Sequence, residues 1–141
     1  MDPASCTEKI RPFLVMDVLE AAHALEDDGH DIVHLEIGEP DFDTPECVKE
    51  AAAKAIHDGQ THYTHSLGVL ALREALCEDY HARYGVSICP DQIVVTSGTS
   101  PAMLLAFGAL LEPGDEVLLP DPGYACYPNF VHFARGLPQR L

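Results

Sequence analysis

The chain has 141 residues and carries 8 Lys and Arg residues against 23 Asp and Glu residues, giving a formal net charge of −15. Such a charge repels nucleic acids and anionic membranes, so both are excluded as main partners. No apolar run approaches the ~20 residues of a membrane-spanning helix, and no basic and then apolar leader opens the sequence. The composition favours a soluble, cytoplasmic protein consisting of one domain or of part of a larger one.

The cysteine and histidine patterns argue against a metal centre. The five Cys residues are widely spaced and form no C-x-x-C pair, so neither a zinc site nor a disulfide framework is expected. The eight His residues are scattered, and no pair has the spacing of a helical motif such as H-E-x-x-H. Free thiols fit a reducing cytosol.

The beginning of the chain predicts an arm, a helix and a short strand. Residues 1–12 are polar and contain two prolines, which indicates an extended arm. Apolar residues recur at helical spacing over 13–28, and Gly29 follows as a C-cap. Residues 31–37 then largely alternate apolar and polar side chains, which predicts a half-buried strand.

Two further helices are expected before the middle of the chain. Thr44 as N-cap opens a helix over 45–57, and a second helix over 69–84 ends at Gly85. Between them, residues 60–68 are dense in hydrogen-bonding side chains, as is typical of a binding loop.

A strand-to-helix turn follows within residues 92–111. Residues 92–96 are rich in Ile and Val and predict a buried strand, and residues 102–111 predict a helix. Ser100 suits the N-cap and Pro101 the first helical position. In open α/β sheets such a turn directs backbone N–H groups and a positive dipole end toward phosphorylated ligands. The turn is therefore a candidate phosphate cradle, although any strand-to-helix turn needs a glycine and a cap.

The last third of the chain completes the predicted fold. Residues 116–120 predict a second buried strand, 124–135 a helix, and 137–141 the start of a third strand. This order predicts an α/β fold built of parallel β-α-β units. Because a parallel sheet buried on both faces needs more strands than these, we expect the chain to be incomplete.

Five motifs in this order resemble the class I and II aminotransferases, the pyridoxal-phosphate enzymes of fold type I. The motifs are Gly38-Glu39-Pro40-Asp41-Phe42-Asp43-Thr44-Pro45; Tyr63-Thr64 with Gly68 and Leu72-Arg73-Glu74-Ala75; Val94-Val95-Thr96-Ser97-Gly98-Thr99; Pro113-Gly114-Asp115-Glu116-Val117; and Asp121-Pro122-Gly123-Tyr124 with Tyr127-Pro128. The resemblance implies that residues 46–141 begin the large cofactor-binding domain, and that residues 1–45 form an arm and a small-domain segment.

The resemblance also implies a cofactor, pyridoxal 5'-phosphate, and residues that bind it. Gly98, Thr99 and Ser100 would bind its phosphate through backbone N–H groups and a hydroxyl. Tyr124 would stack on its pyridine ring, although a tyrosine near a helix start also suits the core.

Two more residues acquire roles from the resemblance. Tyr63 would reach the partner's cofactor phosphate across a homodimer interface, or it is simply a loop tyrosine with a solvated hydroxyl. Gly38 would lie beside the substrate carboxylate, where the absence of a side chain permits close approach, or it is a simple turn glycine.

The implied activity is transfer of an amino group between an amino acid and a 2-oxo acid. Family catalysis depends on a lysine that forms a Schiff base with the cofactor. The three lysines, Lys9, Lys49 and Lys54, lie in no motif resembling that region. We therefore assign no catalytic residue and expect the 141-residue chain alone to be inactive.

Two alternatives remain open. The chain could be a non-catalytic module that binds a phosphorylated ligand or dimerises. It could also belong to a lyase or decarboxylase that uses the same cofactor, because a fold does not determine the reaction. The sequence does not specify the amino-acid substrate.

Overall fold

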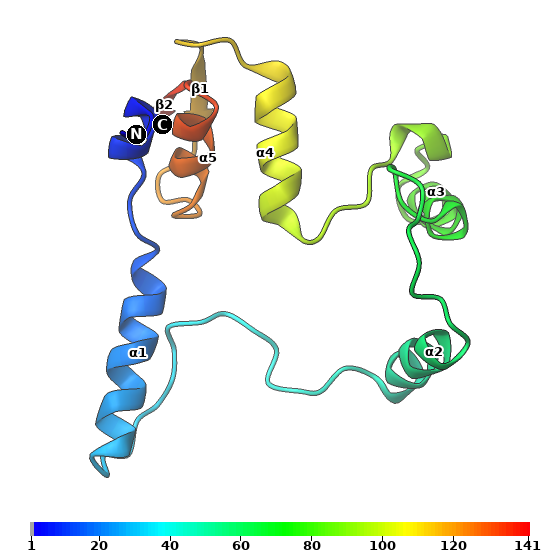
Figure 1. The fold of residues 1–141 in the computed structure, drawn as a ribbon, viewed down its shortest axis with the longest axis horizontal. Helices are drawn as coiled ribbons and strands as arrows, with labels where there is room; N and C mark the ends of the chain where they lie inside the picture. Colours follow the sequence, from blue (N-terminus) through cyan, green and yellow to red (C-terminus); the bar gives the residue numbers. More distant parts are fainter. Residues whose placement is uncertain (1) are drawn as a thin grey trace. The chain divides into compact units, whose positions relative to one another are not determined.

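The computed structural model describes residues 2–141, which form two units (Figure 1). Unit 1 comprises residues 2–40 and 98–141, and unit 2 comprises residues 41–97. In chain order the elements are η1 (Ser5–Lys9), α1 (Leu14–Asp27), α2 (Glu46–His57), α3 (Leu70–Tyr84), η2 (Pro90–Gln92), α4 (Thr99–Leu110), β1 (Glu116–Leu119), α5 (Tyr127–Phe133) and β2 (Leu137–Arg140). The expected boundary between a small-domain segment, 1–45, and a large-domain segment, 46–141, remains a prediction.

Unit 1 contains a parallel pair of strands connected by a helix. β1 and β2 pair from Glu116 with Leu137 to Leu119 with Arg140. α5 connects the two strands, and its Val131 side chain is fully buried. A Cβ added to Gly136 would lie 3.0 Å from Val131 Cγ1, so a side chain there would crowd the packing. The predicted α/β class and parallel β-α-β connection are confirmed.

Two predicted strands are absent from the described part of the chain. Residues 31–37 are irregular. Residues 92–96 begin with the last residue of η2 and then form no strand, since they pair with no strand within residues 2–141. The Val95 N–H donates to the Leu67 carbonyl at 2.9 Å, but no ladder follows. A strand is stabilised by a neighbour that pairs its backbone groups, and the sheet here contains β1 and β2 alone.

The segment after α1 is tethered through a histidine. His34 Nδ1 lies 2.6 Å from Glu36 Oε1, and His34 Nε2 lies 3.0 Å from Glu26 Oε1. Hydrogen bonds to Glu36, which has the larger effect, and to Glu26 raise the pKa of His34. The hydrogen bond with His34 in turn lowers the pKa of Glu36. In this segment the side-chain contacts of His34 are therefore present instead of the expected backbone pairing with a strand.

The predicted helices are present, but α2 and α4 have other N-caps than predicted, and α5 begins at Tyr127 instead of Tyr124. The N-cap of α2 is Pro45 rather than Thr44. The N-cap of α4 is Gly98 rather than Ser100, so Pro101 occupies the third helical position instead of the first. Gly98 has φ +95°, a conformation that glycine adopts readily, and this lets the helix begin earlier than the cap pattern indicates.

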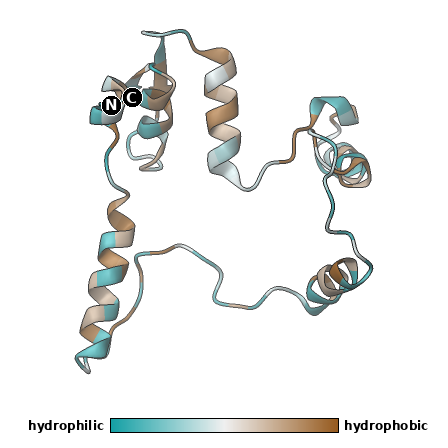
Figure 2. Ribbon diagram, in the orientation of Figure 1, coloured by the Kyte–Doolittle hydropathy of each residue, from teal (hydrophilic) through white to brown (hydrophobic). Residues whose placement is uncertain are grey.

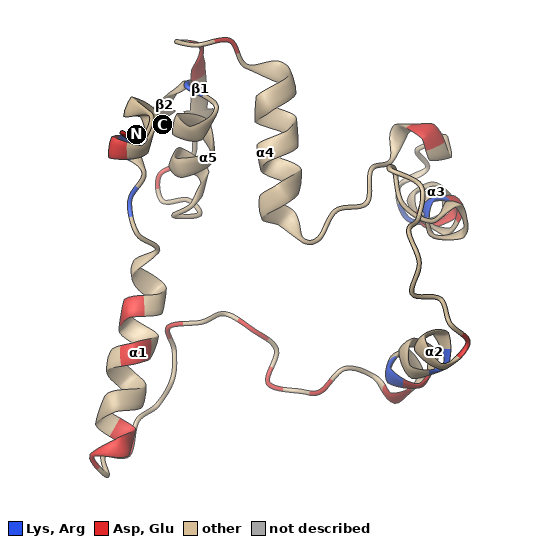
Figure 3. Ribbon diagram, viewed as in Figure 1, with Lys and Arg blue, Asp and Glu red and all other residues tan. Residues whose placement is uncertain are grey.

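The most apolar helix of the chain is α4 (Figures 2 and 3). It contains no Asp, Glu, Lys or Arg, and none of its side chains is buried among the described residues. Leu105 and Leu110 are 59% and 76% exposed. A helix that is apolar on all sides is typical of a buried element, so α4 presents unfilled contact surface. None of the helices within residues 2–141 combines the length and hydropathy needed to cross a lipid bilayer.

In unit 2, a buried arginine connects α3 to the segments that precede and follow it. Arg73 on α3 is 4% exposed, and its guanidinium donates to the Gly68 carbonyl at 3.2 Å and the Pro90 carbonyl at 2.8 Å. The Asp91 carboxylate lies 3.4 Å away but is 89% exposed, so water screens this ion pair. The two carbonyl bonds are therefore the main anchor.

Replacing Arg73 tests this anchor. We expect Arg73→Met to lower the free energy of unfolding by about 3 kcal/mol, because two carbonyls lose charged donors. Urea unfolding followed by circular dichroism measures the loss. The matched control is Arg83→Met, which removes an exposed pair with Asp79 in the same helix and should cost about 0.5 kcal/mol or less. Equal losses in the two variants would contradict the assignment.

Candidate functional site

The turn after β1 presents Tyr124 at the surface of unit 1. A Cβ added to Gly123 would lie 2.5 Å from the Pro120 carbonyl oxygen, so this turn requires glycine. Tyr124 precedes α5 instead of starting it as predicted, and it is 47% exposed. The tyrosine is therefore accessible and not part of the core.

Two aromatic rings contact Tyr124 edge-on. The Phe13 ring centroid lies 6.1 Å away at an interplanar angle of 70°, and the Tyr127 centroid lies 5.2 Å away at 78°. Such edge-to-face contacts restrain the orientation of a ring. The pKa of the Tyr124 hydroxyl is raised, chiefly by a hydrogen bond with the Cys126 side chain. The phenol therefore stays neutral at physiological pH.

Asn129 attaches the N-terminal arm to α5. The Arg11 N–H donates to Asn129 Oδ1 at 3.0 Å, and Asn129 Nδ2 donates to the Arg11 carbonyl at 2.8 Å. The arm, predicted to be extended, contains η1, which packs against α5. This attachment lies two residues before Phe13 and so helps to hold Phe13 against Tyr124. Sequence reasoning missed this role because an amide that pairs with distant backbone leaves no motif.

A small cavity of about 60 Å³ lies beside Tyr124. Its lining includes Asp121 and Arg140, which form an ion pair at 3.3 Å. Because one water needs about 10–15 Å³ of such space, the cavity has room for a few waters or one small polar group. The wall of the cavity thus contains a carboxylate and a guanidinium beside Tyr124.

The N-terminal end of α4 is open. Apart from its own chain neighbours, no atom of the described residues lies within 4 Å of a Cβ added to Gly98, so there is space beside the first turn. Glycine, as the N-cap, has no side chain of its own that could fill this space. The side chains of Thr99 and Ser100 are exposed, and the turn contains no acidic residue. The turn therefore offers N–H groups, two hydroxyls and the positive end of the helix dipole to an anion.

This open turn and Tyr124 belong to the same unit. α4 packs against α5, and the N-terminal end of α4 and the loop between β1 and α5 lie toward the same end of unit 1 (Figure 1). Gly38 lies in an irregular part of unit 1, and apart from its chain neighbours a Cβ there would meet no atom of the described residues within 4 Å. Tyr63 belongs to unit 2 and is fully exposed. The ligand-binding roles of Gly98, Thr99, Ser100, Tyr124, Tyr63 and Gly38 remain predictions.

Replacing Asn129 by aspartate tests the attachment of the arm. Asn129→Asp removes the donor to the Arg11 carbonyl and places a carboxylate beside it, at a cost of about 1–2 kcal/mol. We expect trypsin to cleave after Lys9 about tenfold faster, as measured by mass spectrometry. Gln139→Glu is the control, since this exposed amide pairs with Glu116 instead of the arm. Unchanged cleavage in Asn129→Asp would disprove the attachment.

Comparisons with known proteins agree on one family. A family profile described as "Aminotransferase class I and II" matches residues 30–140. A (5-formylfuran-3-yl)methyl phosphate transaminase of Methanocaldococcus jannaschii is 44% identical over 126 residues, covering 89% of this chain and 34% of that protein. An aspartate aminotransferase of Pyrococcus horikoshii is 42% identical over 127 residues, covering 90% of this chain and 32% of that protein.

A solved structure shows the same similarity. The aspartate aminotransferase of Thermus thermophilus with maleate superimposes with a TM-score of 0.93 at 39% identity, covering 99% of this chain and 37% of that chain. The present chain thus spans about a third of the length of the relatives that it matches.

Proposed function

Because the chain belongs to the class I and II aminotransferase family, we propose that it forms the phosphate-binding part of a pyridoxal 5'-phosphate site in an aminotransferase. The activity is transfer of an amino group between an amino acid and a 2-oxo acid. The main support is the first turn of α4, where Thr99 and Ser100 follow the N-cap Gly98 without an acidic residue, in the same unit as Tyr124.

The charge distribution around this turn fits a phosphorylated cofactor. The chain has a formal charge of −15, yet α4 contains no acidic residue. A phosphate dianion at the first turn would accept hydrogen bonds from N–H groups and from the Thr99 and Ser100 hydroxyls. It would meet no carboxylate within the helix itself.

The remaining residues of the proposed site orient ligands. When bound, pyridoxal phosphate supplies an electron sink that stabilises negative charge at the substrate Cα. Tyr124, held by its two ring contacts, would pack against the cofactor ring. Gly38 would allow the substrate carboxylate to approach the backbone. In a cytoplasmic homodimer, the exposed Tyr63 would reach the partner's cofactor.

Ser100→Asp tests the phosphate cradle without disrupting the helix. A carboxylate in the first turn stabilises α4 through the helix dipole but repels a phosphate. With 4'-deoxypyridoxine 5'-phosphate, which has no aldehyde to react with lysines, we expect calorimetry to show at least about tenfold weaker binding. Helix content should be unchanged.

Ser66→Asp is the matched control, because it makes the same charge change in an exposed loop of unit 2. It should bind the probe as the unaltered chain does. The cradle would be disproved by equal weakening in both variants, or by equally tight binding of 4'-deoxypyridoxine without its phosphate.

A second candidate is a binding module without catalysis, and the lysines favour it for the 141-residue chain by itself. Lys49 pairs with Glu46 at 3.1 Å, and Lys54 pairs with Asp58, so both are engaged along α2. Lys9 lies in η1 and does not line the cavity beside Tyr124. We therefore assign none of the three as the lysine that carries the cofactor.

We therefore expect no transamination by this chain above the slow reaction of free cofactor. The chain would be mixed with pyridoxal phosphate, an amino-acid donor and a 2-oxo-acid acceptor, and product formation compared with cofactor alone. The reason is that proton transfer at the substrate Cα needs a base within hydrogen-bond reach. Turnover well above the control, lost when Lys9, Lys49 or Lys54 is changed to Arg, would show that the chain is catalytically sufficient.

A further inference from the structure

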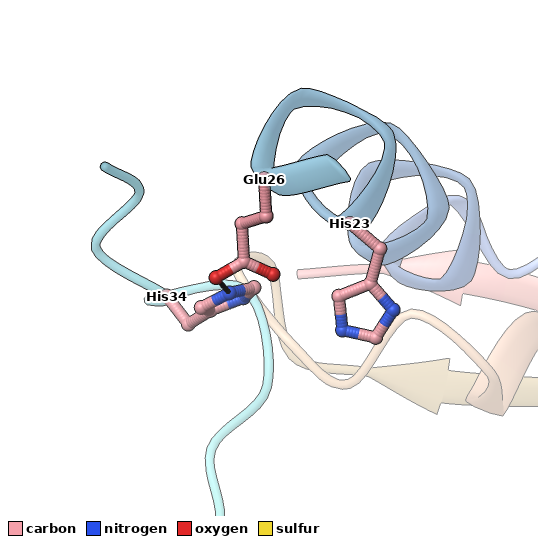
Figure 4. Close-up of side chains that lie close together, drawn as sticks. All are labelled: His23, Glu26 and His34. Carbon is pink, nitrogen blue, oxygen red and sulfur yellow. Dashed lines mark ion pairs between the residues drawn. The ribbon is translucent and has the colours of Figure 1, made fainter. Parts of the chain in front are cut away.

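Three side chains able to bind a metal converge near the end of α1 (Figure 4). His23 and Glu26 lie one helical turn apart on α1, and His34 comes from the irregular segment that follows. Ligand atoms of the three side chains all lie within 4.8 Å of one another. The two imidazole rings meet edge-on, with centroids 5.6 Å apart. The cluster therefore joins a helix to a segment without regular structure.

The ligand types and distances suit zinc. Two imidazole nitrogens and one carboxylate oxygen, with water as the fourth ligand, form a common tetrahedral zinc site. Bonds of about 2.0–2.1 Å place neighbouring ligand atoms about 3.3 Å apart. His34 Nε2 and Glu26 Oε1 are already 3.0 Å apart. Because the three side chains are exposed, small rotamer changes bring His23 to the same distance.

Glu36 holds His34 in the orientation that a metal ligand needs. Its carboxylate lies 2.6 Å from His34 Nδ1, and its side chain is 9% exposed. A carboxylate that accepts the Nδ1 proton leaves Nε2 to bind a metal, the arrangement found around many metal-bound histidines. Nε2 is the atom that faces Glu26.

The surrounding charge also favours a cation. Asp27, Asp28 and Asp31 flank the cluster in the sequence, and acidic residues mark this end of α1 (Figure 3). Lys and Arg are absent from the whole stretch 12–48. A divalent ion would offset part of this negative charge.

We propose that His23, Glu26 and His34 form a site for a zinc-class divalent metal ion, with Glu36 orienting His34. The ion ties α1 to residues 31–37, which have no strand partner within residues 2–141. This segment ends directly before Gly38, so the metal orders the backbone that leads to the candidate substrate-binding residue. The site is structural, and its existence does not depend on the proposed aminotransferase activity.

Calorimetric titration of the 141-residue chain with ZnCl₂ tests the site. We expect one saturable ion per chain, weakened at least about 100-fold in His23→Gln and in His34→Gln, and about 10- to 100-fold in Glu36→Gln. The matched control is His30→Gln, an exposed imidazole between the ligands that is outside the cluster, and it should bind as the unaltered chain does. Circular dichroism of each metal-free variant checks that folding is unchanged.

Cobalt provides a second measurement that loss of structure alone would not reproduce. Co²⁺ in this site should give the intense visible absorption of tetrahedral coordination, and Zn²⁺ should displace it. The proposal is overturned if Zn²⁺ does not saturate, if His30→Gln weakens binding as much as His34→Gln, or if Co²⁺ shows the weak spectrum of an octahedral surface complex. Should one ligand variant misfold, the other two decide the outcome by the same criteria.

Discussion

Unit 1 depends on the packing of α5 against the parallel strands β1 and β2, and Val131 is the side chain of α5 that this packing buries. Val131 has no exposed surface, and Leu119 on β1 is also buried. Gly136 lies so close to Val131 that a side chain there would crowd it, and this permits the short connection from α5 to β2. Tyr124 lies three residues before α5, and Asn129 lies in its first turn, so this packing fixes the element that follows the tyrosine and receives the arm.

The proposed cofactor site combines an uncharged helix start with a restrained aromatic ring. Each part alone is common in proteins, because many helices begin at glycine and many tyrosines pack on rings. Their occurrence in one unit gives the combination chemical meaning, since a phosphate and a pyridine ring belong to the same ligand. α4 carries no charged residue although the chain as a whole is strongly acidic.

Local patterns predicted most of the helices and the parallel connection of β1 and β2, because spacing, caps and glycines act within a few residues. The same logic failed for residues 31–37 and 92–96, where a strand pattern is present but no neighbouring strand within residues 2–141 pairs with it. It placed the α4 N-cap at Ser100, although the positive φ of Gly98 allows an earlier start. The link between Asn129 and Arg11 spans 118 positions, and His34 lies outside the helix of His23, so neither grouping has a sequence signature.

The two units differ in what they remove from water. Among residues 41–97, Arg73 alone is buried, and it is bonded to carbonyls, whereas unit 1 buries Ala22, Leu119 and Val131. Exposing apolar surface raises the heat capacity on unfolding, and exposing polar surface lowers it. We therefore expect the Arg73 anchor to contribute less to the heat capacity of unfolding than the apolar packing around Val131 does. Cooling weakens apolar burial, so we expect the Arg73 anchor of α3 to lose less of its strength at low temperature than the packing around Val131 does.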